Sequence, residues 1–347
     1  MDRLLREMLD AFLVTHSPSG QEEEMVEAAM PYLRRFCDEA WENPHGDLVG
    51  RIAGESAEGG LVIAAHKDEI GQMVERIDED GRVTLVGMGG SQAWRYGEGP
   101  YDLLGDEVVT GVLSIGSTHV SARSADIQAA KTNTPMNWEA SRVVTGLSRE
   151  ELHERGVNIG TRACVARSRK TPMYMGERVC GYGLDDKGAV AAALLAAKLL
   201  GEGARPPVDV YFAITAMEEG GCSGGQYVAR ELPVETMLAV EVGPIAPEYE
   251  LAMGPAPVVV FKDRFIYTRA VCERLCSLGE ELGFGHQRAI LNCFGTDASV
   301  ALQTGLIARA GCVCFPTENT HGYEMAHFES IVNTGRMLAA YAANPTL

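Results

Sequence analysis

Imidazole and carboxylate side chains occur at several separated places in this chain, each close to the end of a short apolar run. These are the ligand types that zinc and cobalt accept in hydrolases. A two-metal site needs several of them, with one carboxylate shared between ions about 3.5–4 Å apart. The candidates are His66, Asp185, Glu218, Glu219, Glu241 and His321. No segment is decisive alone, but together they favour a dinuclear metallohydrolase.

Paired acidic residues supply most of the carboxylates. Asp185 lies in a glycine-bounded turn just before an expected helix, which makes it a natural bridge between two ions. The next residue, Asp186, begins that helix and is expected to accept hydrogen bonds from its free N–H groups. Glu218 and Glu219 point to opposite sides if their backbone is extended. One of them can therefore hold an ion while the other takes a proton from water.

The two imidazoles, one for each ion, are predicted to be His66 and His321. His327 is an alternative candidate for this second imidazole ligand, because it is close to His321 in sequence. We favour His321, which lies in a polar loop directly after an expected strand. Asp68 lies two residues beyond His66 on the same strand face. Its carboxylate can therefore accept a hydrogen bond from the other nitrogen of the imidazole and orient the ring.

The elements that must position these residues alternate between strand and helix. The run of residues 61–65 is short, apolar and typical of a buried parallel strand, and it ends directly before His66. Further strands are expected at residues 208–215, 237–242, 289–293 and 307–315, and a helix at 188–200. Such alternation predicts an α/β fold, a mostly parallel sheet sandwiched by helices. Ligands bind such sheets at the C-terminal ends of the strands.

The pattern changes between residues 71 and 165, where alternating β-branched segments are separated by Gly and Asp-Gly turns. Helical periodicity is nearly absent there, apart from residues 148–155. We therefore expect a small β-rich domain of residues 71–165, inserted into a catalytic domain made of residues 1–70 and 166–347. Two helices around a turn are expected within the first 40 residues.

Charge and composition exclude several classes of function. The chain has 347 residues, enough for about two domains. Its net charge of −18 argues against nucleic acid and anionic membranes as partners. Its nine cysteines show no framework spacing, which predicts free thiols in a reducing compartment. No signal-peptide core and no run of about 18 apolar residues is present, so we expect a cytoplasmic protein.

Through these residues and the short motifs around them, the chain resembles the tetrahedral aminopeptidases of metallopeptidase family forty-two, the glutamyl, leucyl and lysyl aminopeptidase group. The resemblance spans essentially the whole length, and its motifs occur in the family's order. The end of the inserted domain is also similar, at residues 148–152 and 156–160. The motifs are residues 17–20 (SPSG), 66–71 (HKDEIG), 184–188 (LDDKG), 218–219 (EE), 295–298 (GTDA) and 316–321 (PTENTH).

The resemblance implies a zinc-exopeptidase-like fold that holds two divalent ions, Zn²⁺ or Co²⁺. It also implies a PDZ-like insertion used for dimers and for higher assembly such as a dodecamer. By position, one ion would be held by His66 and Glu241, and the other by Glu219 and His321. Asp185 would bridge the ions. The resemblance further implies that Glu218 is the general base, that Asp68 orients His66, and that the peptide bond between Asp185 and Asp186 is often cis.

Two positions depart from the family's pattern. Glu241 stands where Asp is more usual, and its added methylene is expected either to be absorbed by the backbone or to weaken that metal site. Lys67 stands where a small hydroxyl residue is common. Its ammonium group could contact an acidic substrate, but we expect it to face solvent, because lysine is rarely buried.

The leading hypothesis is an aminopeptidase that removes N-terminal residues from short peptides, with water activated by two ions and Glu218. One alternative keeps the metal chemistry but acts as an N-deacylase or amide hydrolase on small metabolites. The other is a catalytically silent homologue kept for assembly or metal binding. The sequence does not indicate which N-terminal residue is preferred.

Overall fold

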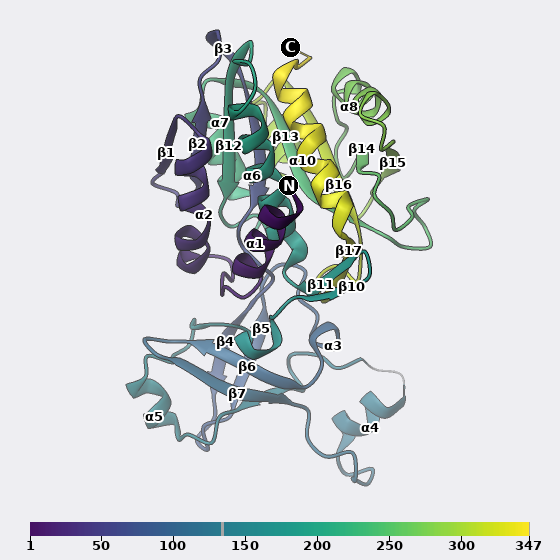
Figure 1. The fold of residues 1–347 in the computed structure, drawn as a ribbon. Helices are drawn as coiled ribbons and strands as arrows, with labels where there is room; N and C mark the ends of the chain where they lie inside the picture. The colour runs from purple at the N-terminus through teal and green to yellow at the C-terminus, as the bar shows by residue number, and fades with distance from the viewer. Residues whose placement is uncertain (133–134, 347) are drawn as a thin grey trace.

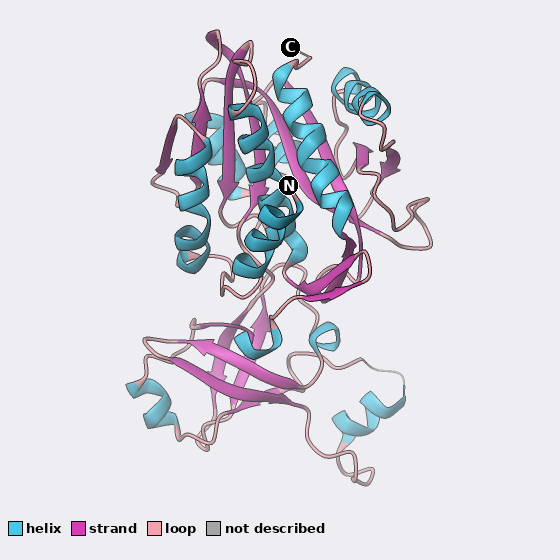
Figure 2. Ribbon diagram, viewed as in Figure 1, coloured by secondary structure: helices cyan, strands magenta, loops and turns pink. Residues whose placement is uncertain are grey.

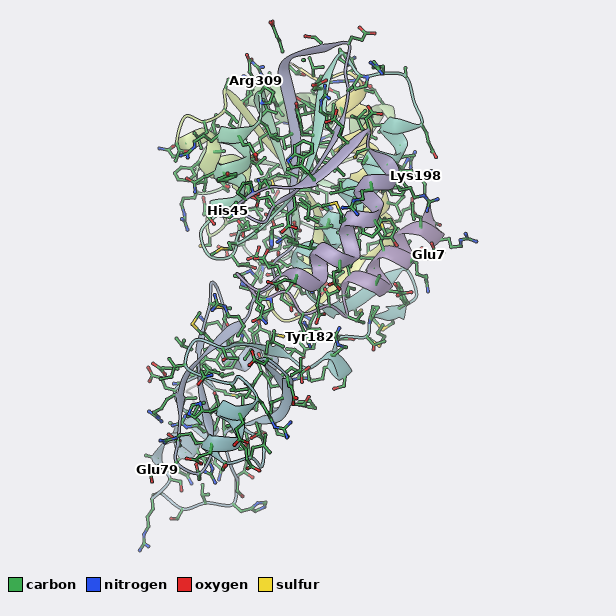
Figure 3. All side chains as sticks on the ribbon, turned by 90° about the vertical axis from the view of Figure 1, so that its left-hand side faces the viewer. Glu7, His45, Glu79, Tyr182, Lys198 and Arg309 are labelled. Carbon is green, nitrogen blue, oxygen red and sulfur yellow. The ribbon has the colours of Figure 1, made fainter. Side chains whose placement is uncertain are left out.

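The computed structural model describes residues 1–132 and 135–346 and arranges them as a larger α/β part and a smaller β part (Figures 1 and 2). The two parts meet at a narrow junction, close to which Tyr182 is labelled in Figure 3. No helix in the described ranges is long and apolar enough to cross a membrane.

Four parallel strands form the centre of the large sheet. In sheet order they are β12 (Val208–Thr215), β3 (Ser56–His66), β13 (Val234–Pro244) and β16 (Arg309–Glu318). Every residue of β12 is buried, so this part of the sheet is covered on both faces. Because the strands run the same way, their C-terminal ends share one edge, as the sequence predicted.

Strands that run antiparallel to their central neighbours flank this centre on both sides. On one side of the centre, a two-stranded hairpin pairs with β12. On the other side, three strands continue the sheet beyond β16, and a further pair of strands branches from β16. The flanking strands are β1 (Glu39–Glu42), β2 (Leu48–Ile52), β10 (Met173–Met175), β11 (Arg178–Tyr182), β14 (Val258–Lys262), β15 (Gln287–Ile290) and β17 (Tyr323–His327).

The helices cover the sheet in two groups. Helix α6 packs on β3 and β13 and against α10, α1 and α2, whereas α7 and α9 pack on each other and on strands β12, β13 and β16. The close approach of α6 and α10 requires a glycine, since a Cβ on Gly335 would lie 2.8 Å from the Ala192 carbonyl oxygen. The helices are α1 (Asp2–Phe12), α2 (Glu23–Phe36), α6 (Leu184–Gly201), α7 (Ser223–Glu231), α8 (Arg269–Glu281), α9 (Asp297–Gln303) and α10 (Phe328–Ala343).

The smaller part is a closed β-barrel with its own apolar core, which includes Tyr101, Leu103 and Val143. Its strands, in barrel order, are β4 (Gln72–Ile77), β5 (Val83–Gly87), β8 (Arg142–Val144), β7 (Val108–Ser114), β6 (Gly99–Leu104) and β9 (Arg162–Val165).

Three short helices accompany the barrel: α3 (Ala93–Tyr96), α4 (Ala125–Thr132) and α5 (Arg149–Glu154), with a 3₁₀ turn at Arg167–Arg169. Helix α5 was expected, and a capping box between Ser148 and Glu151 begins it. Helix α4 was not expected. Its described side chains are exposed or half-buried, so no apolar periodicity marks it in the sequence.

Buried charges of the larger part lie beside the junction, where Lys170 Nζ is 3.8 Å from Cys164 Sγ of the barrel strand β9. Lys170 Nζ lies 2.5 Å from Glu69 Oε1, and Lys187 Nζ lies 3.2 Å from Glu69 Oε2. Both ammonium groups also donate to the Thr15 carbonyl oxygen. Burial would raise the pKa of Glu69, but the two lysine charges hold it at about 2. Glu69 is therefore the counterion of two lysines that have no access to bulk water.

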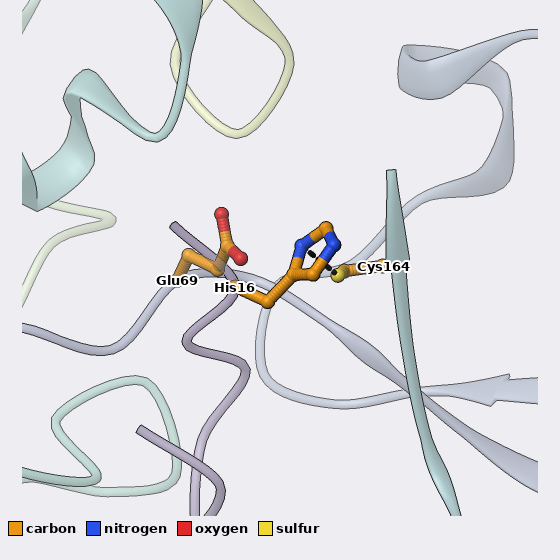
Figure 4. A group of neighbouring side chains, drawn as sticks. All are labelled: His16, Glu69 and Cys164. Atoms are coloured by element: carbon orange, nitrogen blue, oxygen red, sulfur yellow. Dashed lines mark hydrogen bonds between the residues drawn. The ribbon is translucent and has the colours of Figure 1, made fainter. Parts of the chain in front are cut away.

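The same junction contains His16, Glu69 and Cys164, drawn in Figure 4. Cys164 Sγ lies 3.2 Å from His16 Nδ1, and His16 Nε2 lies 3.0 Å from Asp102 Oδ2. A thiol beside an imidazole resembles a cysteine nucleophile with its base. However, burial raises the pKa of Cys164 to about 12, so the thiol stays protonated at neutral pH. Lys170 Nζ lies 3.0 Å from His16 Nδ1, so a cation already occupies the place a metal ion would need. We interpret the cluster as a structural junction.

Replacing Glu69 with Gln is expected to lower the free energy of unfolding at pH 7 by about 3–5 kcal/mol, since it leaves two buried ammonium groups without a counterion. The pKa of Glu69 is about 2 in the folded chain against an ordinary 4.5. The stabilisation is therefore complete above pH 4.5 and is lost as the pH falls from 4.5 toward 2. Urea unfolding at pH 7 and pH 3 measures both effects. The exposed Glu79→Gln serves as control, and an equal loss in both variants would contradict the assignment.

Candidate metal centre

His66 is the last residue of β3 and is almost fully buried. Its Nδ1 lies 2.9 Å from the main-chain oxygen of Asp68. A carbonyl oxygen only accepts, so Nδ1 carries the hydrogen and Nε2 presents a lone pair. That Nε2 lies 3.2 Å from Asp185 Oδ1 and 3.9 Å from Glu241 Oε2. Together with Glu218, whose Oε2 lies 3.8 Å away, these carboxylates converge on the nitrogen that could bind a metal ion.

Asp185 lies between the two imidazoles. While its Oδ1 faces His66, its Oδ2 lies 3.4 Å from His321 Nε2. The turn that carries it begins with Gly183 at φ +75°, and the peptide bond from Asp185 to Asp186 is cis, as the resemblance implied. The two oxygens of one carboxylate therefore point toward two different histidines, which is the arrangement that a bridging ligand requires.

Glu219 completes the second group of candidate ligands. Its Oε1 lies 3.6 Å from His321 Nε2, and this buried oxygen has no hydrogen-bond partner within the described part of the chain. Asp185, Glu219 and His321 form one cluster with metal-ligand spacing, and His66, Asp185, Asp186 and Glu241 form another. Asp185 belongs to both. His327 lies elsewhere, with its Nε2 3.4 Å from Glu177 Oε2.

Asp68 connects the end of β3 to the turn that bears the paired glutamates. Its carboxylate accepts hydrogen bonds from the main-chain N–H of Glu218 at 2.9 Å and of Glu219 at 3.2 Å. It also accepts from Ser19 Oγ at 2.6 Å. Its Oδ1 lies 3.4 Å from His66 Nδ1, farther than these partners. The carboxylate therefore holds the glutamate turn at least as directly as it holds the imidazole.

Asp186 does not cap helix α6 as expected. Its backbone angles are not helical, and its Oδ2 accepts a hydrogen bond from the main-chain N–H of His66 at 3.1 Å. The helix N-cap is Gly183, which has no side chain to cap with. The turn directs Asp186 back toward β3, so this carboxylate joins two elements of the site.

Lys67 does not face solvent, and that prediction was wrong. Its side chain is 2% exposed and forms an ion pair with Glu22, which is also buried. Glu22 comes from the turn before α2, far away in sequence, and supplies the counterion that makes burial of a lysine tolerable.

Glu324 is a residue of the site that sequence reasoning missed. It is buried on β17, and its carboxylate accepts hydrogen bonds from the main-chain N–H of Asp185 and of His321, each at 2.9 Å. It therefore holds the backbone of two candidate ligands. Its position three residues after His321 is the only sequence signal, and the strand pairing that buries it was not predicted.

The buried acidic groups of this site favour bound cations. Burial raises the pKa of Glu219 and of Glu241 well above the ordinary value, and the neighbouring charges of Asp185 and Asp186 add to this effect. Burial would lower the pKa of His66, but Asp186, Asp185 and Asp68 raise it well above its ordinary value. Crowded buried carboxylates of this kind are stabilised by bound metal ions. The donor chemistry and the unpartnered oxygen of Glu219 both fit a divalent pair.

A cleft of about 300 Å³ opens over this centre. One wall carries the acidic ligands together with Glu218, whose Oε2 lies 3.8 Å from His66 Nε2. The lining also includes Arg264, Phe265 and Phe294. A neighbouring cleft of about 390 Å³ is lined by Trp94, Tyr249 and Phe294, so both cavities share a wall and meet at Asp185 and His321.

The barrel contributes backbone to the edge of this centre. Gly89 and Gly90 follow β5 and lie against the second group of ligands. A Cβ on Gly90 would come within 2.5 Å of His321 Nδ1, and one on Gly89 within 2.8 Å of the Glu219 carbonyl oxygen. Only a residue without a side chain allows this approach.

Replacing Gly90 with Ala is expected to displace the His321 ring and lower kcat/KM about 10²-fold, the usual cost of moving a catalytic group by about 1 Å. The kinetics of amide hydrolysis and the metal content measure the two effects. Gly254→Ala is the control, because a Cβ there meets nothing within 4 Å. Equal activity of both variants would show that the ring has room to move.

The comparisons with known proteins agree with this geometry. Residues 46–337 match the model of the M42 glutamyl aminopeptidase family. A putative aminopeptidase of Acetivibrio thermocellus is 26% identical over 96% of each chain. The lysyl aminopeptidase of Pyrococcus furiosus is 26% identical over 73% of this chain and 72% of its own.

Solved structures show the same fold. An aminopeptidase from the archaeon Desulfurococcus kamchatkensis superposes with a TM-score of 0.88, at 23% identity over 99% of this chain and 96% of that one. The TET1 peptidase of Pyrococcus horikoshii, described as assembling into a tetrahedron or a large octahedral shell, gives 0.84 at 23% identity over 98% and 99%. The chain therefore belongs to the M42 glutamyl aminopeptidase family and is a metal-dependent aminopeptidase.

Proposed function

We propose that this protein removes N-terminal residues from short peptides with the help of two divalent ions, Zn²⁺ or Co²⁺. The observation that carries the proposal is the placement of Asp185, whose two oxygens face His66 and His321 inside a buried acidic cluster. His66 and Glu241 would hold one ion, and Glu219 and His321 the other. When bound, the ions would polarise the scissile carbonyl and acidify water.

Glu218 is the proposed general base. It lines the cleft beside both groups of ligands, and burial raises its pKa above the ordinary value. Its carboxylate accepts the proton of the attacking water and passes it to the nitrogen of the leaving amine. Asp68 positions this base through the main chain of the glutamate turn, in addition to orienting His66.

Dependence on a free amino terminus tests the proposal. The metal-loaded protein is expected to cleave aminoacyl anilides and to reject the same compounds when they are N-acetylated. The opposite preference would identify an N-deacylase. Absence of both activities, with two ions bound, would favour a silent homologue.

We further propose residues 1–70 and 166–347 as the catalytic domain and residues 71–165, PDZ-like by resemblance, as an inserted dimerisation domain. The outward-facing Val108, Val112 and Val144 of the barrel support a role in self-association, and the dodecamer of a structural relative supports larger assembly. A cytoplasmic location is proposed because all nine cysteines are free. Sedimentation analysis of the full chain would test the assembly.

A further inference from the structure

Consecutive main-chain N–H groups of the glutamate turn, residues 216–219, all donate to buried carboxylates. Those of the two glutamates donate to a single aspartate, as described above. The N–H of Ala216 donates to Asp47 Oδ1 at 2.8 Å, and the N–H of Met217 donates to Glu22 Oε1 at 3.2 Å. The main chain that leads to the paired glutamates is therefore held by acidic side chains from separate segments of the sequence.

The glutamate turn also contains an unusual backbone conformation. Met217 has φ +54°, which residues other than glycine rarely adopt and which persists only where the surroundings impose it. Glu218 and Glu219 line the catalytic cleft, whereas Ala216 and Met217 line a separate cleft of about 230 Å³. Open space therefore borders the turn at two places, and apolar packing there does little to fix it. The shape of the turn depends on the carboxylates that accept from its N–H groups.

Glu22 is the one of these carboxylates that pairs with a lysine. It is 5% exposed, its Oε1 also accepts from the Gly20 N–H at 2.9 Å, and its Oε2 pairs with the buried Lys67 ammonium. A buried carboxylate is tolerated when a cation and hydrogen bonds satisfy it. A small hydroxyl residue, which is common at position 67 in the family that the chain resembles, carries no charge to offset Glu22. The ion pair is therefore tied to the departure at Lys67.

We propose that the buried ion pair of Glu22 and Lys67 positions the general base, Glu218, by fixing the main chain one residue before it. The inference rests on the proposed role of Glu218. Asp68 holds the N–H of the base itself, whereas Glu22 holds the N–H of Met217 and so fixes the direction in which the base enters the cleft. A base takes a proton only when it lies within hydrogen-bond reach of the water. Glu22 is therefore a positioning residue, and its effect falls on kcat.

Two paired substitutions test this role without leaving a buried charge unpaired. Glu22→Gln with Lys67→Met, the acceptor variant, keeps a side-chain oxygen for the N–H of Met217. Glu22→Met with Lys67→Met, the apolar variant, has nearly the same volume but no acceptor. The described lining of the catalytic cleft includes neither position, so substrate binding is not altered directly. We expect the kcat of the apolar variant to be at least about tenfold lower than that of the acceptor variant, with KM within about twofold.

The same comparison in a Glu218→Gln background separates positioning from a general loss of structure. If Glu22 acts through the base, the difference between the two variants disappears there, because coupled residues are not additive. Thermal denaturation and metal analysis are expected to show that both variants are folded and hold two ions. The exposed neighbour Glu23 is the control, and Glu23→Gln is expected to change kcat by less than about twofold.

The outcomes distinguish this inference from the proposed function. Equal kcat of the two paired variants, with Glu218→Gln impaired, would overturn the inference and leave the proposed base intact. A difference that persists in the Glu218→Gln background, or a loss of ions from the apolar variant, would also overturn it, because Glu22 would then act through the fold or through Glu219. Unimpaired activity of Glu218→Gln would overturn the proposed base and the inference together.

Discussion

Replacing Glu218 with Gln is expected to lower kcat by about 10²–10⁴-fold, the usual contribution of a general base. Gln has almost the same shape but cannot take the proton of the attacking water. Glu218 is not among the five proposed metal ligands, so both ions are expected to stay bound. Cleavage of an aminoacyl anilide, measured beside metal content by elemental analysis, separates loss of the base from loss of the ions.

The matched control for this variant is Glu248→Gln. Glu248 is exposed and lines the neighbouring cleft, but it contacts neither group of ligands. We expect its kcat to stay within about twofold of the unmodified protein, as for surface substitutions in general. Full activity of Glu218→Gln with both ions present would remove Glu218 from the mechanism, and a loss of metal would make it a ligand instead.

Replacing Asp185 with Asn is expected to weaken binding of both ions and to lower activity at least about 10³-fold. The reason is geometric, since the two oxygens of this carboxylate face different histidines. An amide keeps one weak oxygen donor and turns the other into a hydrogen-bond donor that repels a cation. Metal content after dialysis is expected to fall from two equivalents to less than one. Apparent thermal stability is expected to fall with it, because ions bound to the folded state stabilise it.

The number of ions lost distinguishes a bridging Asp185 from one that binds a single ion. Loss of only one equivalent would mean that Asp185 belongs to a single ion and that Asp186, which is in the same cluster as His66 and Glu241, takes part in binding. The control is His327→Ala, the rival of His321 in the sequence. Its imidazole lies beside Glu177, away from the centre, so both ions are expected to remain.

Much of the fold followed from local patterns. Short apolar runs predicted the central strands, and the direction of parallel strands predicted that His66, the glutamate pair and Glu241 would meet at one edge. The turn around Asp185 predicted a candidate bridge, and its two carboxylate oxygens face His66 and His321. These features depend on residues close to one another in sequence, where periodicity and turn chemistry are informative.

The parts that were missed depend on distant residues. Nothing near Lys67 indicates that Glu22 will be its counterion, and nothing near His321 indicates that Gly90 of the barrel will lie against its ring. Glu324 is buried by a strand pairing between β17 and β11. Such contacts arise from packing of the whole chain, which a single sequence does not display.

The barrel strand β5 and the two glycines after it limit how far this enzyme could be shortened. Gly89 and Gly90 are part of the wall around Glu219 and His321. A shortened chain that joins Ile70 directly to Ala166 would keep the proposed ligands and the large sheet, yet it would expose one side of the second group of proposed ligands to bulk water. On this geometry the barrel is not a detachable module, and its loss would leave the proposed second metal site incomplete.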